Sequence, residues 1–265
     1  MIKFFRKIRQ RLLTENNFPK YLLYAFGEIL LVVIGILIAL QINNWNQQRL
    51  DNQEESKLVQ SISEKIEFNK FQYNVGLNRY EEVIKSAQQL LQDIYNPNTK
   101  RNQQQFDKDL HSITKRFLMG KSNSVSIYDE MIGAGQLTLL SSEDLRKSIT
   151  SLKANLLLLE SYEDIQINFV ENQLNPFLNR NTDIISIYAN GSISDSSFYD
   201  RSIAIDYRSF YQEKNSSSYD RLMQNREFSN LLFELIKQTK TVLPIYKRIG
   251  ENISDIESII ISMDL

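Results

Sequence analysis

The chain has 265 residues, of which 42% are hydrophobic and 24% are charged, and this composition is typical of a folded protein rather than a disordered one. It contains no cysteine, which excludes disulfides, thiolate metal sites and cysteine nucleophiles, and its single histidine, His111, excludes a metal site made of several histidines. Six basic residues and one acid precede residue 21, whereas 25 basic and 30 acidic residues lie from Asn43 onward. The mildly acidic body predicts no binding to nucleic acid.

The strongest pattern is an apolar segment near the N-terminus. Residues 19–44 are predicted to form a transmembrane helix, because positions 29–40 carry no polar side chain and the segment is long enough to cross a bilayer. A buried helix of a soluble protein and a cleaved signal peptide are the alternatives. Bulky residues close the apolar segment where a signal peptidase needs small ones, so we expect an uncleaved anchor.

Aromatic and basic residues flank this segment. Tyr21 and Tyr24 lie near one end and Trp45 at the other, which are the positions of aromatic interface anchors in membrane helices. Residues 1–18 are basic with apolar residues at helical spacing, so we expect an amphipathic segment on the cytoplasmic surface. The positive-inside rule then places the N-terminus in the cytoplasm of a Gram-negative cell and the C-terminal part in the periplasm, with the anchor in the inner membrane.

Glu28, Gly35 and Ala39 are predicted to form a packing face on the transmembrane helix. They lie seven and four residues apart, near one side of the helix, and Gly35 and Ala39 form a small-x-x-x-small pattern that lets two helices approach closely. A carboxyl group inside the bilayer is costly, which favours a donor for Glu28 on a partner helix. A snorkelling carboxylate and a proton relay are the alternatives.

Residues 45–265 are predicted to form an all-α periplasmic bundle. The helix that leaves the membrane is expected to continue to the turn at Asn96-Pro97-Asn98, because apolar residues recur along it every seven positions. Its predicted core series comprises Val59, Ile66, Tyr73, Tyr80, Ala87 and Ile94, with Leu77, Ile84 and Leu91 at the interleaved positions.

The last helix carries a stronger pattern. One predicted seven-residue series comprises Phe228, Leu235, Val242, Ile249, Ile256 and Met263, and the other comprises Leu232, Thr239, Tyr246, Ile253 and Ile260. Two interleaved series of this kind are typical of a bundle or coiled-coil seam. We expect Pro244 to kink or split this helix, and we expect the first and last helices to pair antiparallel.

Shorter helices are predicted between these two. They cover residues 106–118, residues 125–134 with a stop at Gly135, and a segment that is capped by Ser141 or Ser142 and stops at Pro176. The core face predicted for the third comprises Leu145, Ile149, Leu152, Leu156 and Leu159.

Residues 177–218 are rich in Asn, Ser, Asp and Tyr and are predicted to form an irregular excursion from the bundle. Within them, Asn190-Gly191 between two β-prone runs predicts a small β-hairpin over residues 185–194. Long irregular insertions often carry function. The predicted partner surface comprises Tyr188, Tyr199, Tyr207 and Tyr211, and the alternative is that these rings cover the end of the bundle.

The sequence contains no recognisable catalytic constellation. Gly133-Ala134-Gly135 is not followed by the Lys-Ser that opens a phosphate-binding helix. Asp129-Glu130 and Glu143-Asp144 are neighbours in sequence and point to different helix faces, so they make poor catalytic or metal-binding pairs. His111 is expected to be a surface residue. We therefore expect no enzymatic activity, no cofactor and no metal.

Two stretches of the sequence resemble a family of single-pass inner-membrane proteins of Bacteroidota. The first is FFRKIRQRLL followed by KYLLYAFGEILLVVIGILIALQINNWN, and the second is YDEMIGAGQLTLLSSEDLRKSI, from Tyr128 to Ile149. Gly133-Ala134 stands where the family more usually has Ser-Ser. The resemblance implies an inner-membrane location, carries no assigned activity and transfers no catalytic residue.

These observations favour a membrane-anchored structural or interaction subunit that presents a helical domain to the periplasm. Its partners would be the lipid bilayer and a protein, or a second copy of the chain, bound through the transmembrane helix. The first alternative is a periplasmic sensing or ligand-binding bundle, which would signal through a partner membrane protein because a cytoplasmic part of about 20 residues is too short for an output domain. An accessory part of an enzyme or transporter is the second alternative. The ligand, the partner, the oligomeric state and the physiological process are left open.

Overall fold

The structure, a computed structural model, describes residues 18–96, 102–114, 124–191 and 217–263. Every element of regular secondary structure in these residues is helical, which confirms the all-α prediction. The chain divides into two compact units, Met1–Lys57 and Leu58–Leu265. The elements are α2 (Phe18–Tyr95), α3 (Gln103–Thr114), α4 (Ser124–Gly133), η1 (Gln136–Leu139), α5 (Glu143–Phe169), η2 (Val170–Leu174), α6 (Asn175–Asn181), α7 (Ile184–Gly191), α8 (Ser217–Met223) and α9 (Arg226–Ser262).

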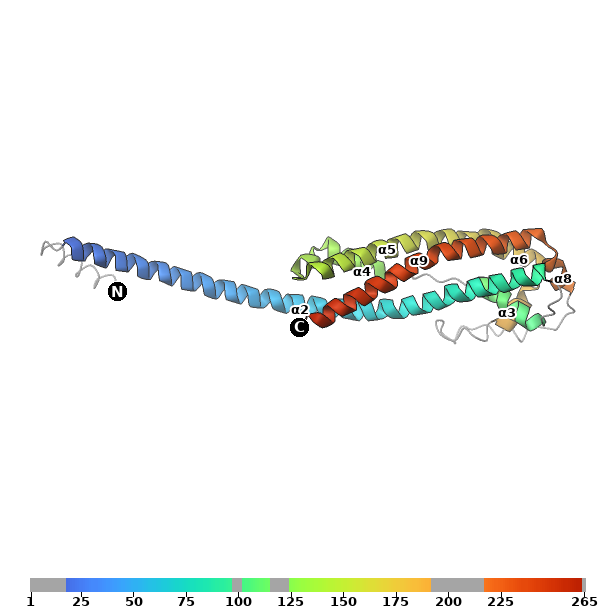
Figure 1. The fold of residues 1–265 in the computed structure, drawn as a ribbon, viewed down its shortest axis with the longest axis horizontal. Helices are drawn as coiled ribbons and strands as arrows, with labels where there is room; N and C mark the ends of the chain where they lie inside the picture. Colours follow the sequence, from blue (N-terminus) through green and yellow to red (C-terminus); the bar gives the residue numbers. More distant parts are fainter. Residues whose placement is uncertain (1–17, 97–101, 115–123, 192–216, 264–265) are drawn as a thin grey trace. The chain divides into compact units, whose positions relative to one another are not determined.

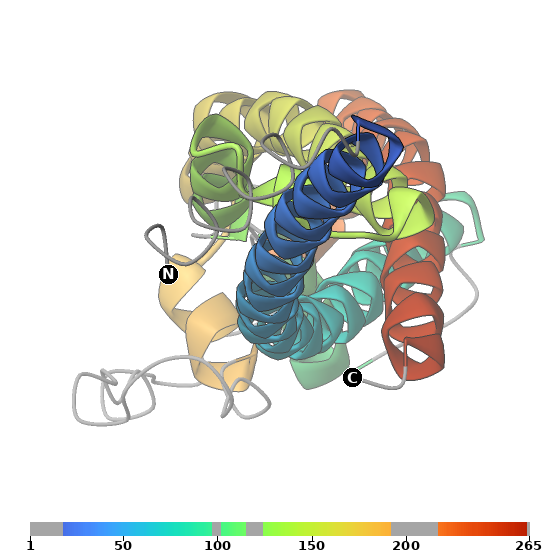
Figure 2. The ribbon, with the colours of Figure 1, turned by 90° about the vertical axis from the view of Figure 1, so that its left-hand side faces the viewer.

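Three long helices form the framework of the second unit: the later part of α2, α5 and α9 (Figure 1). Lys70 of α2 pairs with Glu257 of α9 at 2.7 Å, and the rings of Tyr80 and Tyr246 lie 5.1 Å apart between their centroids. Residue numbers therefore rise along α2 as they fall along α9, which confirms the predicted antiparallel pairing. Seen along the long axis, the three helices of this unit surround a common centre (Figure 2).

α9 is also antiparallel to α5. The Nδ2 atom of Asn155 donates to Asn252 at 2.8 Å, and farther along α5 the Nε2 atom of Gln166 donates to Thr239 at 2.9 Å. Because α2 and α5 both run opposite to α9, they run parallel to each other, and the chain must return between them. α3 and α4 lie on that return path.

The positions of α3 and α4 are fixed by polar contacts with the long helices. Ser86 of α2 donates to Asp109 of α3 at 2.8 Å, in the later part of α2. Asn69 donates to the buried Tyr128 hydroxyl of α4 at 2.5 Å, closer to the beginning of the unit. The predicted stop of α4 is confirmed, since the helix ends at Gly133 and Gly135 adopts a positive φ of 70°.

The core face of α2 confirms one predicted series and corrects the other. In the first predicted series, Val59, Ile66, Tyr80 and Ala87 are at most 4% exposed, and Tyr73 and Ile94 are half-buried. The predicted interleaved residues Leu77, Ile84 and Leu91 are all only half-buried. The second buried series comprises Ile62, Asn69, Gly76, Val83 and Leu90. A search for apolar residues skips Asn69 and Gly76, so it selected the neighbouring side of the helix.

The patterns predicted for α5 and α9 are confirmed. Nine of the eleven predicted positions in α9 are buried, and Ile260 and Met263 are half-buried. Pro244 lies inside α9 without splitting it, and Figure 1 shows the helix bending near its middle. All five residues of the predicted α5 face are buried, and the Ser142 side chain caps this helix by accepting from the Leu145 N–H at 3.1 Å.

Three predictions for the region after α5 are wrong where the structure describes it. Pro176 does not stop the helical path, because it lies in the first turn of α6, where its missing N–H is harmless. Residues 184–191 form α7 instead of one arm of a β-hairpin, and residues 192–194 lie outside the described residues. The predicted irregular excursion is helical over most of 177–191. The turn signal at Asn190-Gly191 is overridden by contacts with α3, which a local pattern cannot show.

Two separate hydrophobic cores fill the bundle. The first core joins apolar residues of α2 up to Tyr80, of α4, of α5 up to Leu159 and of α9 from Val242 onward. The second core joins those of α2 from Val83 onward, of α3, α6, α7 and α8, and of α9 up to Ile236, together with Phe169, Val170 and Leu174. Each long helix therefore passes from one core to the other.

Two neighbouring leucines of α5 test this assignment of the core. Leu156 is fully buried, whereas Leu157 is 42% exposed. We expect Leu156→Ala to lower the free energy of unfolding by about 2–5 kcal/mol, because it removes buried methyl groups and leaves a cavity. We expect Leu157→Ala, the matched control with the same helix propensity change, to lower it by roughly 0.5–1 kcal/mol. Chemical unfolding followed by circular dichroism measures both, and equal losses would contradict the assignment.

Candidate functional site

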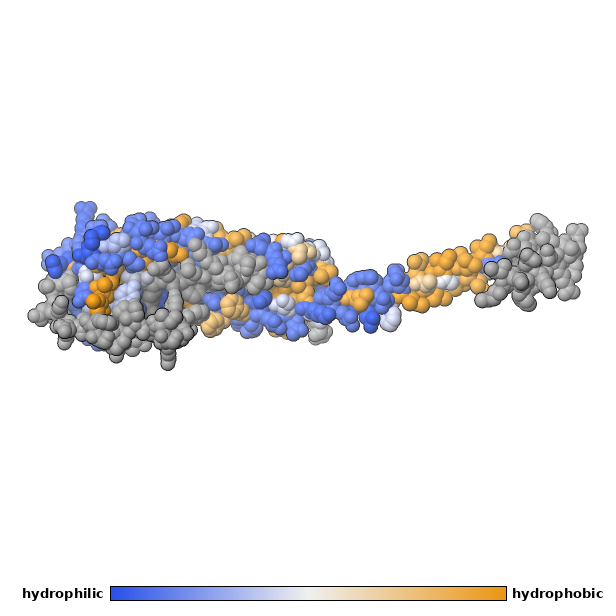
Figure 3. Space-filling view, turned by 180° about the vertical axis from the view of Figure 1, so that it is seen from behind, coloured by the Kyte–Doolittle hydropathy of each residue, from blue (hydrophilic) through white to orange (hydrophobic). Residues whose placement is uncertain are grey.

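The described residues contain one helix that is long and apolar enough to cross a membrane, and its apolar part lies in the first unit. The described Leu, Ile, Val and Phe side chains from Leu22 to Ile42 are between 44% and 78% exposed. Figure 3 shows them as a continuous apolar surface. Each such side chain that is left in water forgoes roughly 1.5–3 kcal/mol of burial energy. A run of this length therefore requires an apolar environment that the described part of the chain does not supply.

The predicted packing face lies on this segment. A Cβ atom added at Gly35 would meet nothing within 4 Å, and Ala39 is exposed. Glu28 is half-exposed and precedes Gly35 by seven residues on the same helix. Among the described residues, Gly35 and Ala39 of this face are therefore exposed.

The predicted interface anchors lie in the same helix. The Trp45 side chain is 67% exposed. Tyr21 and Tyr24 belong to α2, but their side chains lie outside what the structure describes. The structure thus leaves the prediction for the two tyrosines open.

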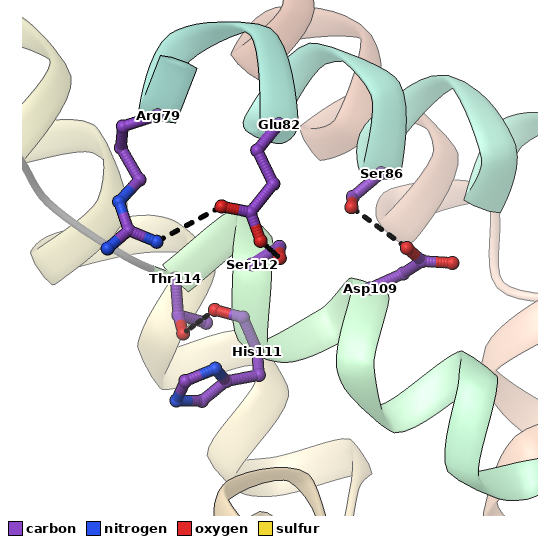
Figure 4. Close-up of polar contacts among 7 residues, drawn as sticks. All are labelled: Arg79, Glu82, Ser86, Asp109, His111, Ser112 and Thr114. Carbon is purple, nitrogen blue, oxygen red and sulfur yellow. Dashed lines mark hydrogen bonds and ion pairs between the residues drawn. The ribbon is translucent and has the colours of Figure 1, made fainter. Parts of the chain in front are cut away.

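A second group of polar residues joins α3 to α2 (Figure 4). Glu82 accepts from the Ser112 hydroxyl at 2.6 Å through one oxygen, and its other oxygen lies 3.2 Å from Nη1 of Arg79. One helical turn farther along α2, Ser86 donates to Asp109. The His111 ring points away from the Ser112–Glu82 pair in Figure 4, so these three side chains do not form a nucleophile–base–acid arrangement.

His111 is buried, which corrects the prediction of a surface residue. Its side chain is 6% exposed, and its ring meets Tyr188 of α7 edge-to-face at 5.2 Å between centroids. A Cβ atom at Gly191 would overlap the His111 ring, so the glycine is what allows α7 to approach α3 this closely. The prediction failed because the partner of His111 lies some 80 residues away in sequence.

The contact between α3 and α7 is centred on a buried carboxylate that the sequence did not reveal. Asp107 is 1% exposed and accepts from Ser186 at 2.5 Å, from Asn190 at 2.7 Å and from Gln103 at 2.8 Å. Burial raises the pKa of Asp107 above its ordinary value of 3.8, and the three donated hydrogen bonds oppose that rise. Ser186 and Asn190 are four residues apart, so they lie on one face of α7, a spacing that could have indicated a helix here.

Of the predicted partner surface, the structure describes Tyr188 alone. It is half-buried and packs on His111, as described above. Tyr199, Tyr207 and Tyr211 lie outside the described residues. The environment of Tyr188 fits the alternative in which the aromatic residues cover the end of the bundle.

Small surface pockets lie among the described residues of the second unit. One, of ≈ 290 Å³, is lined by Arg180, Asn181, Thr182, Asp183, Arg221 and Leu222. Another, of ≈ 260 Å³, is lined by Ser63, Ile66, Glu67, Lys70, Glu257, Ile260 and Ile261. Among the described residues, no three His, Asp or Glu side chains come together in a way that could hold a metal ion.

Comparison with known proteins adds no relative: no family model, no curated protein and no solved structure matches the chain.

The raised pKa of Asp107 predicts a pH dependence of stability. As the pH falls from neutral, the folded protein takes up a proton at Asp107 before the unfolded chain does, so protonation favours the folded state. We expect the stability of the native protein relative to Asp107→Asn to rise as the pH is lowered toward 4 and to be smallest at neutral pH. Chemical unfolding of both proteins across this range measures the difference. A difference that stays constant or shrinks toward low pH would show that Asp107 is not a desolvated carboxylate.

Proposed function

We propose that the protein is a membrane-anchored interaction subunit that presents its helical bundle outside the cytoplasm. The observation that carries the proposal is the uninterrupted exposure of apolar side chains from Leu22 to Ile42. A buried helix of a soluble protein would have this segment inside a core, and here none of its most apolar window is buried. A bilayer supplies the apolar environment that the segment requires.

The proposed orientation places the N-terminus in the cytoplasm and the bundle in the periplasm of a Gram-negative cell. The basic residues that precede the apolar segment support it, because short basic flanks stay on the cytoplasmic side. The resemblance to single-pass inner-membrane proteins of Bacteroidota agrees with this orientation and stays a prediction.

The proposed contact with a partner is the face formed by Glu28, Gly35 and Ala39. Helices associate in a bilayer where small residues allow their backbones to approach, and Gly35 is open to such an approach. A carboxyl group within the apolar segment gains most from a hydrogen-bond donor on the neighbouring helix. The partner is another membrane helix, either of a different protein or of a second copy.

A ligand-binding bundle is the second candidate. The pocket of ≈ 290 Å³ favours it, because Arg180 and Arg221 both line it and arginine binds carboxylates and phosphates well. Asp183 lines the same pocket and opposes an anion there. The first candidate is preferred because a ligand pocket would not explain the exposed apolar segment, whereas a membrane anchor does.

Crosslinking in intact cells tests the proposed contact. We expect a specific crosslinked product in the native protein that falls at least about tenfold in Glu28→Leu, which corresponds to ~1.4 kcal/mol of association energy. Glu54→Leu, at an exposed acid of α2 beyond the apolar segment, is the matched control and should keep the product.

The identity of the product decides between a second copy and another protein, and mass spectrometry gives it. A profile with only the uncrosslinked chain in all three proteins would overturn the interaction role. An equal loss in Glu28→Leu and Glu54→Leu would also overturn it, because the effect would not then be specific to the packing face.

A further inference from the structure

Buried polar side chains lie on α5 and α9 between the residues of the first core and those of the second core, and Tyr80 and Tyr246 of the first core adjoin them. Glu163 of α5 is 1% exposed and Thr239 of α9 is fully buried. The Tyr246 hydroxyl donates to Glu163 at 3.5 Å, and Gln166 donates to Thr239 at 2.9 Å. Tyr80 of α2 packs on Tyr246, so all three long helices contribute. We call Tyr80, Glu163, Gln166, Thr239 and Tyr246 the polar layer.

Each long helix also carries a local weakness close to the polar layer. In α2 it is Gly76, which is buried four residues before Tyr80, and a glycine in a helix interior costs about 1 kcal/mol relative to alanine. On the α5 side it is the π-helical segment Val170–Leu174, which begins four residues after Gln166. π-helical turns are rare and often mark functional sites.

The weakness in α9 is Pro244, five residues after Thr239. Proline lacks the N–H that would bond to the carbonyl four residues earlier, and its ring clashes with that carbonyl. Pro244 is exposed, and a proline on the solvent side of a helix is a known cause of a bend. Figure 1 shows that α9 bends near its middle.

The simpler interpretation is that the polar layer only fixes the register of the helices. Buried polar groups do serve this purpose in bundles. That purpose requires matched hydrogen bonds, but it does not require a weakened helix. All three long helices carry an irregularity within about five residues of the polar layer: a glycine, a π-helical segment or a proline. This coincidence favours a flexible joint over a layer that only fixes the register of the helices.

We propose that the bundle bends in the region of the polar layer, with the parts of the first core and of the second core that lie farther from it each moving as a rigid body. Well-packed apolar cores resist deformation because each shift loses many close contacts. Hydrogen bonds such as Gln166 to Thr239 can be remade in a second geometry, and the weakened helices supply the change in backbone direction. The joint gives the bundle a means of passing a change at α3, α6, α7 and α8 to the parts of α2 and α9 around Val59 and Ile256.

Distances between spin labels test the joint in the full chain, reconstituted in lipid nanodiscs. The chain has no cysteine, so pairs of cysteines can be introduced without removing any. Lys108→Cys with Ala154→Cys joins an exposed site on the second core to one on the first core. Lys108→Cys with Asn230→Cys, both on helices of the second core, is the reference pair.

Two further variants remove the parts of the joint separately. Pro244→Ala restores the missing backbone hydrogen bond. Gln166→Leu combined with Thr239→Val replaces one polar bridge by apolar contacts, while the Tyr246–Glu163 contact remains. Neither variant introduces a large side chain into the core, so folding is expected to be preserved, and the reference pair reports it directly.

We expect the pair across the layer to give a distance distribution at least twice as wide as the reference pair, or with two components. Both variants should narrow it toward the width of the reference pair. A distribution across the layer that is already as narrow as the reference in the native chain would overturn the proposal. A broad distribution that neither variant narrows would also overturn it, because the motion would then arise elsewhere.

Discussion

The antiparallel pairing of α9 with α2 and with α5 is the contact on which the second unit depends. α9 contacts both α2 and α5, and it contributes side chains to both cores. α9 approaches α2 closely where Gly250 meets Tyr73, because a Cβ atom at Gly250 would lie 2.7 Å from the tyrosine ring. A glycine in α9 and an aromatic ring in α2 therefore set the spacing of the two helices, and α3 and α4 occupy the return path that this pairing creates.

The sequence allowed the parts of the fold that follow from local periodicity to be predicted. The seams of α5 and α9 repeat over many turns, so a single misread residue does not change the assignment. The second series of α2 was misread because two of its members, Asn69 and Gly76, are not apolar, and their burial depends on Tyr128 and on the neighbouring helices. α7 was missed for a related reason: the buried carboxylate of Asp107 holds Ser186 and Asn190 from a distance of about 80 residues in sequence, and no local signal reports that contact.

The candidate site, too, could be predicted from the sequence only in part. The positions of Glu28, Gly35 and Ala39 on one helix follow from spacing alone, and the structure adds that Ala39 is exposed and that a Cβ atom at Gly35 would meet nothing within 4 Å. The partner proposed for that face is another membrane helix, so neither the sequence nor the structure of this chain alone contains its identity. The apolar segment exposes apolar groups that need an apolar neighbour, whereas the polar layer buries polar groups that need hydrogen-bond partners within the bundle.

Solvent accessibility of single cysteines in intact cells tests the central claim, membrane anchoring, most directly. With a maleimide that crosses the outer but not the inner membrane, Asp255→Cys should react at once, Lys7→Cys only after lysis, and Val33→Cys only after detergent is added. This order is expected because the three positions lie in the periplasm, the cytoplasm and the bilayer in the proposed arrangement. Labelling of Val33→Cys at the rate of Asp255→Cys would contradict the anchor, and labelling of Lys7→Cys before lysis would contradict its orientation.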